Sequence, residues 1–280
     1  MKESSAVCKK AVLRLQRVLE GILARVEGDL RRIGEFPECG IHSLRRRMKK
    51  LRSILTLARE HVPPSTRRRV KRCMAQLKDD FAGRRDADVM RSLAASIGMP
   101  ERDVAFLRLP PSARSRVSAR HEKSATELRR LVYGLPLETL TWKDVVASFE
   151  RTCRKERKAW IAACDEPSAE VLHAWRKETK TLYYQMLFMH EVSGRLKKRV
   201  KLADRLGRWL GRHHDLDVLA SRVRKSAMSG GKVWLKEIGR RQRKLQRRIF
   251  HAARRLHDKP LARIAKSPTL TRSASRLVTV

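Results

Sequence analysis

Two segments of the chain carry histidine, arginine and lysine at matching positions. They read His42-x-x-Arg45-x-x-x-Lys49-x-x-Arg52 and His173-x-x-Arg176-x-x-x-Lys180-x-x-Tyr183. On an α-helix, offsets of 0, 3, 7 and 10 fall within roughly 80° of the circumference and along about 15 Å of the axis. Each segment therefore predicts a stripe of imidazole, guanidinium and ammonium groups on one helix face. Such a stripe suits a long, evenly charged anion better than a compact substrate, so it indicates polyanion binding.

The helices that must position these stripes carry matching apolar residues. At the same offsets from the two histidines stand Leu44, Met48, Leu51 and Leu55 in the first copy, and Trp175, Thr179, Leu182 and Met186 in the second. These offsets occupy a separate sector, as expected of a helix that packs one face and presents another. A second matched set follows downstream: Leu77, Phe81, Asp86, Asp88, Val89 and Met90, and Leu206, Leu210, Asp215, Asp217, Val218 and Leu219. The agreement predicts an internal duplication with two halves of the same architecture.

The composition is strongly basic. The 280 residues include 67 Lys and Arg against 29 Asp and Glu, a formal charge of +38, while 41% of the residues are hydrophobic. Such self-repulsion disfavours a compact chain, so we expect an anionic partner: nucleic acid, an anionic membrane surface or an inorganic phosphate polymer. Membrane insertion is not expected, because no run approaches the roughly 18 apolar residues of a spanning helix. The N-terminus lacks the order of a secretory signal, and the five cysteines have no ligand spacing, so we expect a cytoplasmic protein with reduced thiols.

Long amphipathic stretches alternate with short breaks that contain Gly or Pro, which predicts an all-α protein. The expected helices cover residues 5–33, 40–61, 65–97, 113–133, 142–164, 168–192, 195–228 and 232–257. Four helices in each half suggest two four-helix bundles in tandem, an N-terminal half over 1–137 and a C-terminal half over 138–258. The Ser/Thr-rich segment 259–280 has no periodicity and is expected to be flexible.

Basic residues also recur at helical spacing outside the two motifs. They are Arg14, Arg17 and Arg25 in the first expected helix and its neighbourhood, and Arg240, Arg243 and Arg247 in the last. They form either an ordinary solvated face or an extension of the anion-binding surface, and the sequence favours neither interpretation.

The Asp86/Asp88 and Asp215/Asp217 pairs suggest a metal site at first, because hard cations prefer carboxylate oxygens. On a continuous helix, however, side chains two residues apart point about 200° from each other and cannot hold one ion. We expect instead that one carboxylate of each pair, assigned to Asp86 and Asp215, pairs with an arginine or histidine and orients the basic site. An ordinary structural salt bridge is the alternative. No metal and no other cofactor is predicted.

The repeated motif, followed by Arg-Asp-x-Asp-Val at 85–89 and His-Asp-x-Asp-Val at 214–218, resembles the CHAD family, the conserved-histidine α-helical domains, over residues 8–257. The resemblance implies one domain of two four-helix bundles related by pseudo-twofold symmetry, with a shared basic cleft or channel. It also implies non-catalytic binding of inorganic polyphosphate, with polyphosphate granules as a candidate location. The chain is similar to stand-alone members, without the CYTH triphosphate-processing domain to which many relatives are fused.

Carried over by position, the resemblance implies a set of polyphosphate-binding residues in each half. They are His42, Arg45, Arg46, Lys49, Lys50 and Arg52 in the first half, and His173, Arg176, Lys177 and Lys180 in the second. Thr181 and Tyr183 depart from the pattern, since basic residues are usual there. We therefore expect the second half to hold the anion less strongly at that end, unless Lys177 or neighbouring helices compensate. The alternative for the two histidines is a structural hydrogen bond to a neighbouring helix.

Two other functions stay open on the sequence alone. A sequence-independent nucleic-acid binder fits the charge equally well, although aromatic residues make up only 5% of the chain and stacking platforms are not evident. A histidine phosphatase or triphosphate hydrolase with His42 or His173 as nucleophile is the third hypothesis, and the sequence contains no hydrolase motif that supports it. The chain is therefore predicted not to be an enzyme, and its oligomeric state and preferred polymer length are not predicted.

Overall fold

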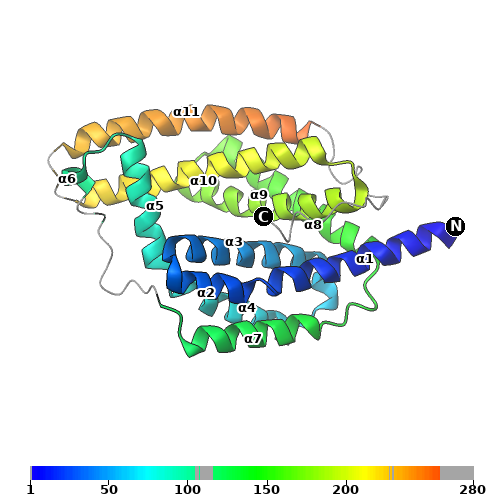
Figure 1. Ribbon diagram of the computed structural model, residues 1–280. Helices are drawn as coiled ribbons and strands as arrows, with labels where there is room; N and C mark the ends of the chain where they lie inside the picture. The colour runs from blue at the N-terminus through cyan, green and yellow to red at the C-terminus, as the bar shows by residue number, and fades with distance from the viewer. Residues whose placement is uncertain (1, 105–106, 108–115, 227, 229, 259–280) are drawn as a thin grey trace.

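A computed structural model of the protein describes residues 2–104, 107, 116–226, 228 and 230–258 (Figure 1). The helices are α1 (Lys2–Leu23), α2 (Val26–Glu35), α3 (Pro37–Leu55), the 3₁₀ helix η1 (Thr56–His61), α4 (Pro64–Asp79), α5 (Ala82–Ser96), α6 (Glu101–Val104), α7 (Ala119–Tyr133), α8 (Trp142–Asp165), α9 (Ala169–Ser193), α10 (Lys197–Lys225) and α11 (Gly231–His257). The described part of the chain contains no strand, which confirms the predicted all-α class. The segment 259–280, predicted to be flexible, lies outside the described residues.

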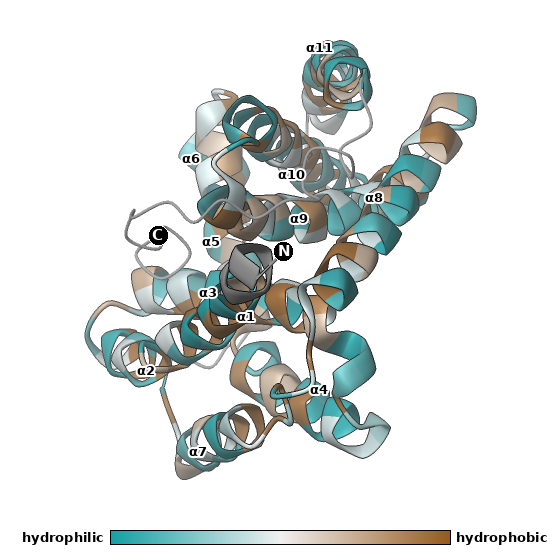
Figure 2. Ribbon diagram, turned by 90° about the vertical axis from the view of Figure 1, so that its right-hand side faces the viewer, coloured by the Kyte–Doolittle hydropathy of each residue, from teal (hydrophilic) through white to brown (hydrophobic). Residues whose placement is uncertain are grey.

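The helices lie in layers, with α11 and α10 at one side of the molecule and α4 and α7 at the other (Figure 1). Helix α9 packs against α8, α10 and α3, and α3 in turn packs against α1 and α2. In the end-on view, α11 stands at the outer edge of the molecule (Figure 2). The two motif helices, α3 and α9, thus meet in the middle of the fold.

The main apolar core is shared by both halves of the chain. Its fully buried members include Leu15, Leu44, Phe149, Leu182 and Leu206, which come from α1, α3, α8, α9 and α10. A smaller cluster joins α5 to α10 and α11 through Leu93, Leu219 and Ile238. Because the main core is continuous across the chain, the division into two separate bundles stays a prediction.

The apolar stripes predicted on the motif helices are the buried faces of α3 and α9. Leu44, Met48 and Leu51 of α3 and Trp175, Thr179, Leu182 and Met186 of α9 are all at most 1% exposed, and Leu55 is half-buried. The amide of Gln185 in α9 also donates to the carbonyl oxygen of Ser53 in α3 at 2.9 Å. Since each helix turns its apolar face inward, its basic stripe lies on a different side.

The helices of the second half begin and end within three residues of the predicted positions. Helix α8 follows a capping box, in which the Thr141 hydroxyl accepts from the N–H of Asp144. Helix α9 follows Ser168, whose hydroxyl accepts from the N–H of Val171. It ends at Gly194, whose φ of 72° is the left-handed conformation that glycine adopts without strain. These local caps explain why the boundaries could be predicted.

The single helix predicted over 5–33 is wrong, because the chain forms α1 and α2 with a turn at Ala24 and Arg25. The turn redirects the chain so that α2 packs along α3, where Val26 and Ile33 are buried. Packing against a second helix therefore outweighs the continuation of the first.

Helix α3 is held against α2 by a buried ionic contact and a close backbone approach. The Asp29 carboxylate of α2 accepts from the Ser43 hydroxyl at 2.8 Å and from two nitrogens of the Arg47 guanidinium. Gly40 lies so close to α2 that a Cβ would stand 2.5 Å from the Ile33 nitrogen, so only glycine fits. These contacts fix the orientation of the helix that carries the first motif.

The helix predicted over 65–97 is also wrong, because α4 and α5 meet at Asp80 and Phe81. Phe81 is fully buried and stacks on His121 of α7, with ring centroids 4.8 Å apart. Beyond this anchor, α5 runs steeply from the level of α3 toward α11 (Figure 1), where Leu93 joins the smaller apolar cluster. Burial of Phe81 and packing of α5 on α10 explain the break.

The other two helices of the first half differ from the prediction at their ends. Helix α3 begins three residues earlier, at Pro37, because the N–H group that proline lacks has no hydrogen-bond partner in the first turn of a helix. The last six residues of the predicted 40–61 helix form the 3₁₀ helix η1 instead. Helix α7 begins at Ala119, because Ser118 and His121 form a capping box there. Residues 113–115 of the predicted 113–133 helix lie outside the described part of the chain.

Candidate anion-binding cleft

A cleft of about 580 Å³ lies where α3, α9 and α10 meet. It is lined by His42, Arg45, Arg46, Lys49 and Lys50 of α3, by Arg176, Lys180, Tyr183, Tyr184 and Leu187 of α9, and by Asp204, Gly207, Arg208, Gly211, Arg212 and Asp215 of α10. Eight of these residues are Lys or Arg, and two are Asp. The structure thus brings residues of both motif copies to one concave, strongly basic surface.

The α3 side of the cleft presents exposed cations beside an anchored one. His42, Arg46 and Lys49 are exposed, whereas Arg45 is half-buried. The Nη1 atom of Arg45 donates to the carbonyl oxygen of Lys78 at 3.0 Å, which fixes its guanidinium against the end of α4. Arg45 thus has a defined position, whereas His42, Arg46 and Lys49 face the solvent from which an anion would arrive.

Lys50 is a buried cation at the inner side of this helix, with only 2% of its surface exposed. Its pKa is lowered from 10.5 to about 8, first by burial and then by the charges of Arg46, Arg47 and Arg25, against a smaller opposing effect of Asp29. An anion in the cleft would favour the charged form of this lysine. The protonation of Lys50 is therefore sensitive to what the cleft contains.

Two glycines of α10 allow the second motif to lie flat against that helix. A Cβ at Gly207 would stand 3.0 Å from Cε and 3.1 Å from Nζ of Lys180, and a Cβ at Gly211 would stand 3.5 Å from Nε of Arg176. The Lys180 ammonium also lies 5.5 Å from the centre of the Tyr183 ring. Burial lowers the pKa of Lys180, and the nearby carboxylate of Asp204 opposes that effect. The Gly207 position thus determines where the Lys180 charge enters the cleft.

Helix α10 supplies lining residues that the sequence analysis missed, namely Asp204, Arg208 and Arg212. Arg208 lies 3.3 Å from the Asp204 carboxylate, and the pKa of Arg212 is lowered by burial against the opposing charge of Asp215. All of them recur at helical spacing from Asp215, so the helix face traced back from that residue could have revealed them. Arg208, whose charge acts on Tyr183, places an additional cation on the side of the cleft where Thr181 and Tyr183 depart from the basic pattern.

Three predicted binding residues lie outside the cleft lining: Arg52, Lys177 and His173. His173 instead faces His214 of α10, with their Nδ1 atoms 3.2 Å apart and their ring centroids 4.3 Å apart. Burial lowers the pKa of His173, and the charges of Lys177 and Arg176 add to the effect. The arrangement of His173 corresponds to the structural alternative, a histidine that contacts a neighbouring helix. A role of these three residues in anion binding stays a prediction.

One of the two carboxylates predicted to orient the site lines the cleft. Asp215 lines the cleft near Arg212, whereas Asp86 is not among the lining residues. In the first Asp-x-Asp pair, Asp88 forms ion pairs with Arg91 at 2.5 Å and with Arg84 at 3.9 Å. Within the described residues, no three His, Cys, Asp or Glu side chains gather as they would to hold a metal ion.

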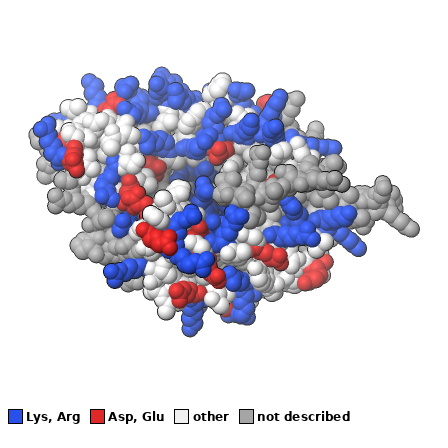
Figure 3. Space-filling view, viewed as in Figure 1, with Lys and Arg blue, Asp and Glu red and all other residues white. Residues whose placement is uncertain are grey.

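The additional basic residues that the sequence singled out do not line the cleft. Arg17 and Arg25 are exposed and Arg14 is half-buried near the N-terminal end, while Arg240, Arg243 and Arg247 are exposed on α11. Lys and Arg side chains gather along the edge of the molecule over α11 and again in the middle of the same face (Figure 3).

None of the described helices is long and apolar enough to cross a membrane.

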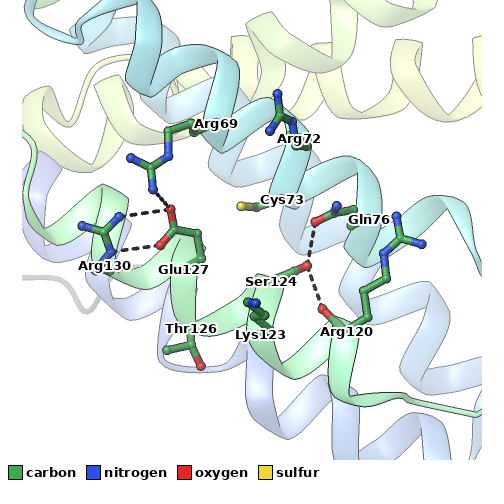
Figure 4. A pocket seen from close by; sticks show the side chains of 10 residues that line it. All are labelled: Arg69, Arg72, Cys73, Gln76, Arg120, Lys123, Ser124, Thr126, Glu127 and Arg130. Atoms are coloured by element: carbon green, nitrogen blue, oxygen red, sulfur yellow. Dashed lines mark hydrogen bonds and ion pairs between the residues drawn. The ribbon is translucent and has the colours of Figure 1, made fainter.

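A second basic groove of about 720 Å³ lies between α4 and α7 (Figure 4). This α4–α7 groove is lined by Arg69, Arg72, Cys73, Gln76, Arg120, Lys123, Ser124, Thr126, Glu127 and Arg130. The Glu127 carboxylate accepts from Arg130 at 2.9 and 3.1 Å and also from Arg69, so it neutralises part of the charge. The groove contains no residue of either motif, which makes it a useful control surface for the cleft.

Comparisons with known proteins agree with this description. The family model of the CHAD domain matches residues 13–224. The crystal structure of the CHAD domain from the plant Ricinus communis is similar over 92% of this chain and 94% of that chain, with a TM-score of 0.60 and 18% sequence identity, which supports the fold. Among curated proteins, no match to the chain is found.

Substitution of Gly207 tests the packing of Lys180 on α10. We expect Gly207→Ala to keep or raise the melting temperature, because alanine favours a helix by up to about 1 kcal/mol over glycine. The added Cβ would displace the Lys180 ammonium, so affinity for long-chain polyphosphate should change by several-fold. Gly211→Ala is the matched control, since its Cβ would meet Arg176 at an ordinary contact distance. Equal affinities of the two variants would show that the position of the Lys180 charge does not affect binding.

The buried charge of Lys50 predicts a pH-dependent stability. Below pH 8 the lysine is charged in both the folded and the unfolded protein, so the full cost of its burial, as much as about 3 kcal/mol, opposes folding. Between pH 8 and 10.5 the folded protein loses this proton first, so the cost disappears as the pH rises. Lys50→Met should therefore be more stable than the wild type at pH 7, and the difference should shrink toward pH 10.5. Urea unfolding across this range measures it, and a difference that stays constant with pH would contradict the assignment.

Proposed function

The chain belongs to the CHAD domain family, and from this premise we propose that it binds inorganic polyphosphate in the cleft between α3, α9 and α10, without catalysing a reaction on it. CHAD domains are linked to polyphosphate binding in general. The observation that carries the proposal is the lining of the cleft, where eight Lys and Arg side chains from three helices face one space with only two carboxylates among them. By the same interaction, the protein would be brought to polyphosphate granules in the cytoplasm.

The chemistry of this lining fits a phosphate polymer. Polyphosphate carries about one negative charge per phosphate, so lysines and arginines along a groove displace condensed counterions from it, as they do from a nucleic-acid strand. Arginine can bridge two phosphate oxygens, whereas lysine contributes a mobile point charge. The cleft offers both: Arg45 and Arg176 are half-buried guanidinium groups, and Lys49 is an exposed ammonium group.

The aromatic residues of the cleft favour polyphosphate over single-stranded nucleic acid. Proteins that bind single strands without sequence preference stack bases on exposed aromatic rings. The lining contains two aromatic residues, of which Tyr184 is 5% exposed and Tyr183 is half-buried beside the Lys180 ammonium. Neither ring offers a broad face to a base, whereas a phosphate chain needs only the cations.

The carboxylates of the cleft support binding rather than catalysis. Asp204 lies beside Arg208 at 3.3 Å, and Asp215 acts on the charge of Arg212. Carboxylates placed in this way orient the basic groups around them. A general acid or base would instead need to face the scissile bond with a proton to transfer.

The proposal is tested by removing exposed cations of the cleft. In the cleft variant, Arg46→Gln/Lys49→Gln/Arg208→Gln, we expect the affinity for labelled long-chain polyphosphate to fall about 100-fold at near-physiological salt. Each cation that faces an anionic polymer contributes about 1 kcal/mol, and the three contributions add. The slope of log affinity against log salt concentration should become shallower by about 2.

The groove variant, Arg72→Gln/Arg120→Gln/Lys123→Gln, is the matched control, because it removes the same charge from exposed residues of the α4–α7 groove. It should lose only the few-fold affinity that follows from the lower net charge. Equal losses of affinity in the two variants would show that bulk charge governs binding. Duplex DNA or single-stranded RNA that competes as well as unlabelled polyphosphate would show the same. Release of phosphate from the bound polymer would overturn the proposal that the protein is not an enzyme.

A further inference from the structure

The outward face of α11 is almost entirely basic. Its exposed residues are Lys232, Val233, Lys236, Arg240, Arg243, Lys244, Arg247, Arg248, His251, Arg254 and Arg255, and Val233 alone among them is neither Lys, Arg nor His. Like charges three or four residues apart destabilise a helix. The helix is held by its opposite face, where Ile238, Ile249 and Leu256 are fully buried. Glu237 offsets part of this repulsion, because its carboxylate pairs with Arg240 and Arg241 at one end of the helix. The large excess of cations on the exposed face is expected of a surface that meets a polyanion.

One flank of α11 repeats the geometry of the two motifs. Arg241, Lys244, Arg248 and His251 have offsets of 0, 3, 7 and 10, as in His42-x-x-Arg45-x-x-x-Lys49-x-x-Arg52, and Arg255 continues the row by one turn. They fall within roughly 80° of the helix circumference and along about 15 Å of its axis. We call these four residues the α11 stripe. Along α11 the residue types run Arg, Lys, Arg, His, which is the reverse of the order in the first motif. A search that starts from the histidine and reads toward the C-terminus therefore does not find this third stripe.

The α11 stripe begins beside the cleft. Arg241 donates from Nη1 to the carbonyl oxygen of Ser96 at 3.4 Å, and Arg212 donates from Nη2 to the hydroxyl of the same serine at 2.5 Å. Arg212 lines the cleft, and its pKa is lowered by burial and also by the nearby charge of Arg241. Ser96, at the end of α5, thus holds two guanidinium groups together, one from the cleft and one from α11.

We propose that the α11 stripe continues the cleft as one binding track, so that the protein discriminates long polyphosphate chains from short ones. This inference rests on the proposed function of the cleft. A short chain fills the cleft alone, whereas a long chain leaves it past Arg212 and lies along α11. The second contact is then intramolecular, because the chain already bound in the cleft raises the effective concentration of phosphate at α11.

The experiment compares tripolyphosphate with polyphosphates of increasing chain length. The α11 variant, Lys244→Gln/Arg248→Gln/Arg255→Gln, removes three exposed cations, as many as the cleft and groove variants do. We expect it to bind tripolyphosphate as the groove variant does and to lose about tenfold or more beyond that variant in affinity for long chains. The groove variant should lose only a few-fold at every chain length. Circular dichroism confirms that α11 stays helical in the variants.

Several results would overturn the inference. Equal losses for the α11 and groove variants would assign the effect to bulk charge, and an unchanged long-chain affinity would remove α11 from the track. A loss of duplex DNA binding by the same factor would make α11 a general nucleic-acid surface. Excess tripolyphosphate should occupy the cleft and displace long chains from the wild type. Long chains that remain bound would show that α11 is an independent second site. Failure of the proposed function itself looks different, because the cleft variant would then keep its affinity for tripolyphosphate.

Discussion

Repulsion between cations that the fold holds close together is the constraint on which this structure depends. Eight Lys and Arg side chains share a cleft of about 580 Å³, and burial together with neighbouring arginine charges lowers the pKa of Lys50 to about 8. This repulsion opposes folding, so apolar burial elsewhere must offset it. The motif helices do this directly, because the faces opposite their basic stripes, with residues such as Met48 and Trp175, are buried in a core that both halves share.

The position of α9 follows from contacts on two sides. On the side of α8, the fully buried carboxylate of Glu156 accepts from the indole N–H of Trp175 at 2.7 Å and from the Thr179 hydroxyl at 3.1 Å. On the side of α10, Lys180 lies against Gly207. A buried carboxylate with good donors fixes its partners strongly, because leaving it unsatisfied costs several kcal/mol, on the order of 3 to 5. The helix therefore cannot slide, and its cations enter the cleft at defined points.

The features that could be predicted from the sequence are those that one helix determines by itself. The apolar and basic stripes of α3 and α9 follow from local periodicity, and the second-half boundaries follow from local caps. The breaks at Arg25 and Phe81 depend on packing against other helices, which periodicity does not contain. Arg208 was missed because its role depends on a neighbouring helix. His173 occupies the same motif position as His42, yet it faces His214 instead of the cleft.

The two copies of the motif have therefore diverged in how they serve one surface. Helix α3 contributes the exposed cations Arg46 and Lys49 beside the half-buried Arg45 and the buried Lys50, whereas both lining cations of α9, Arg176 and Lys180, are half-buried. Exposed charges meet an arriving anion first but are screened by salt, whereas interactions of buried or half-buried charges are screened much less. Capture and retention of a polyanion would then be properties of different residues. A duplicated framework permits this division, because one copy can keep its exposed cations while the other is rebuilt with a neighbouring helix.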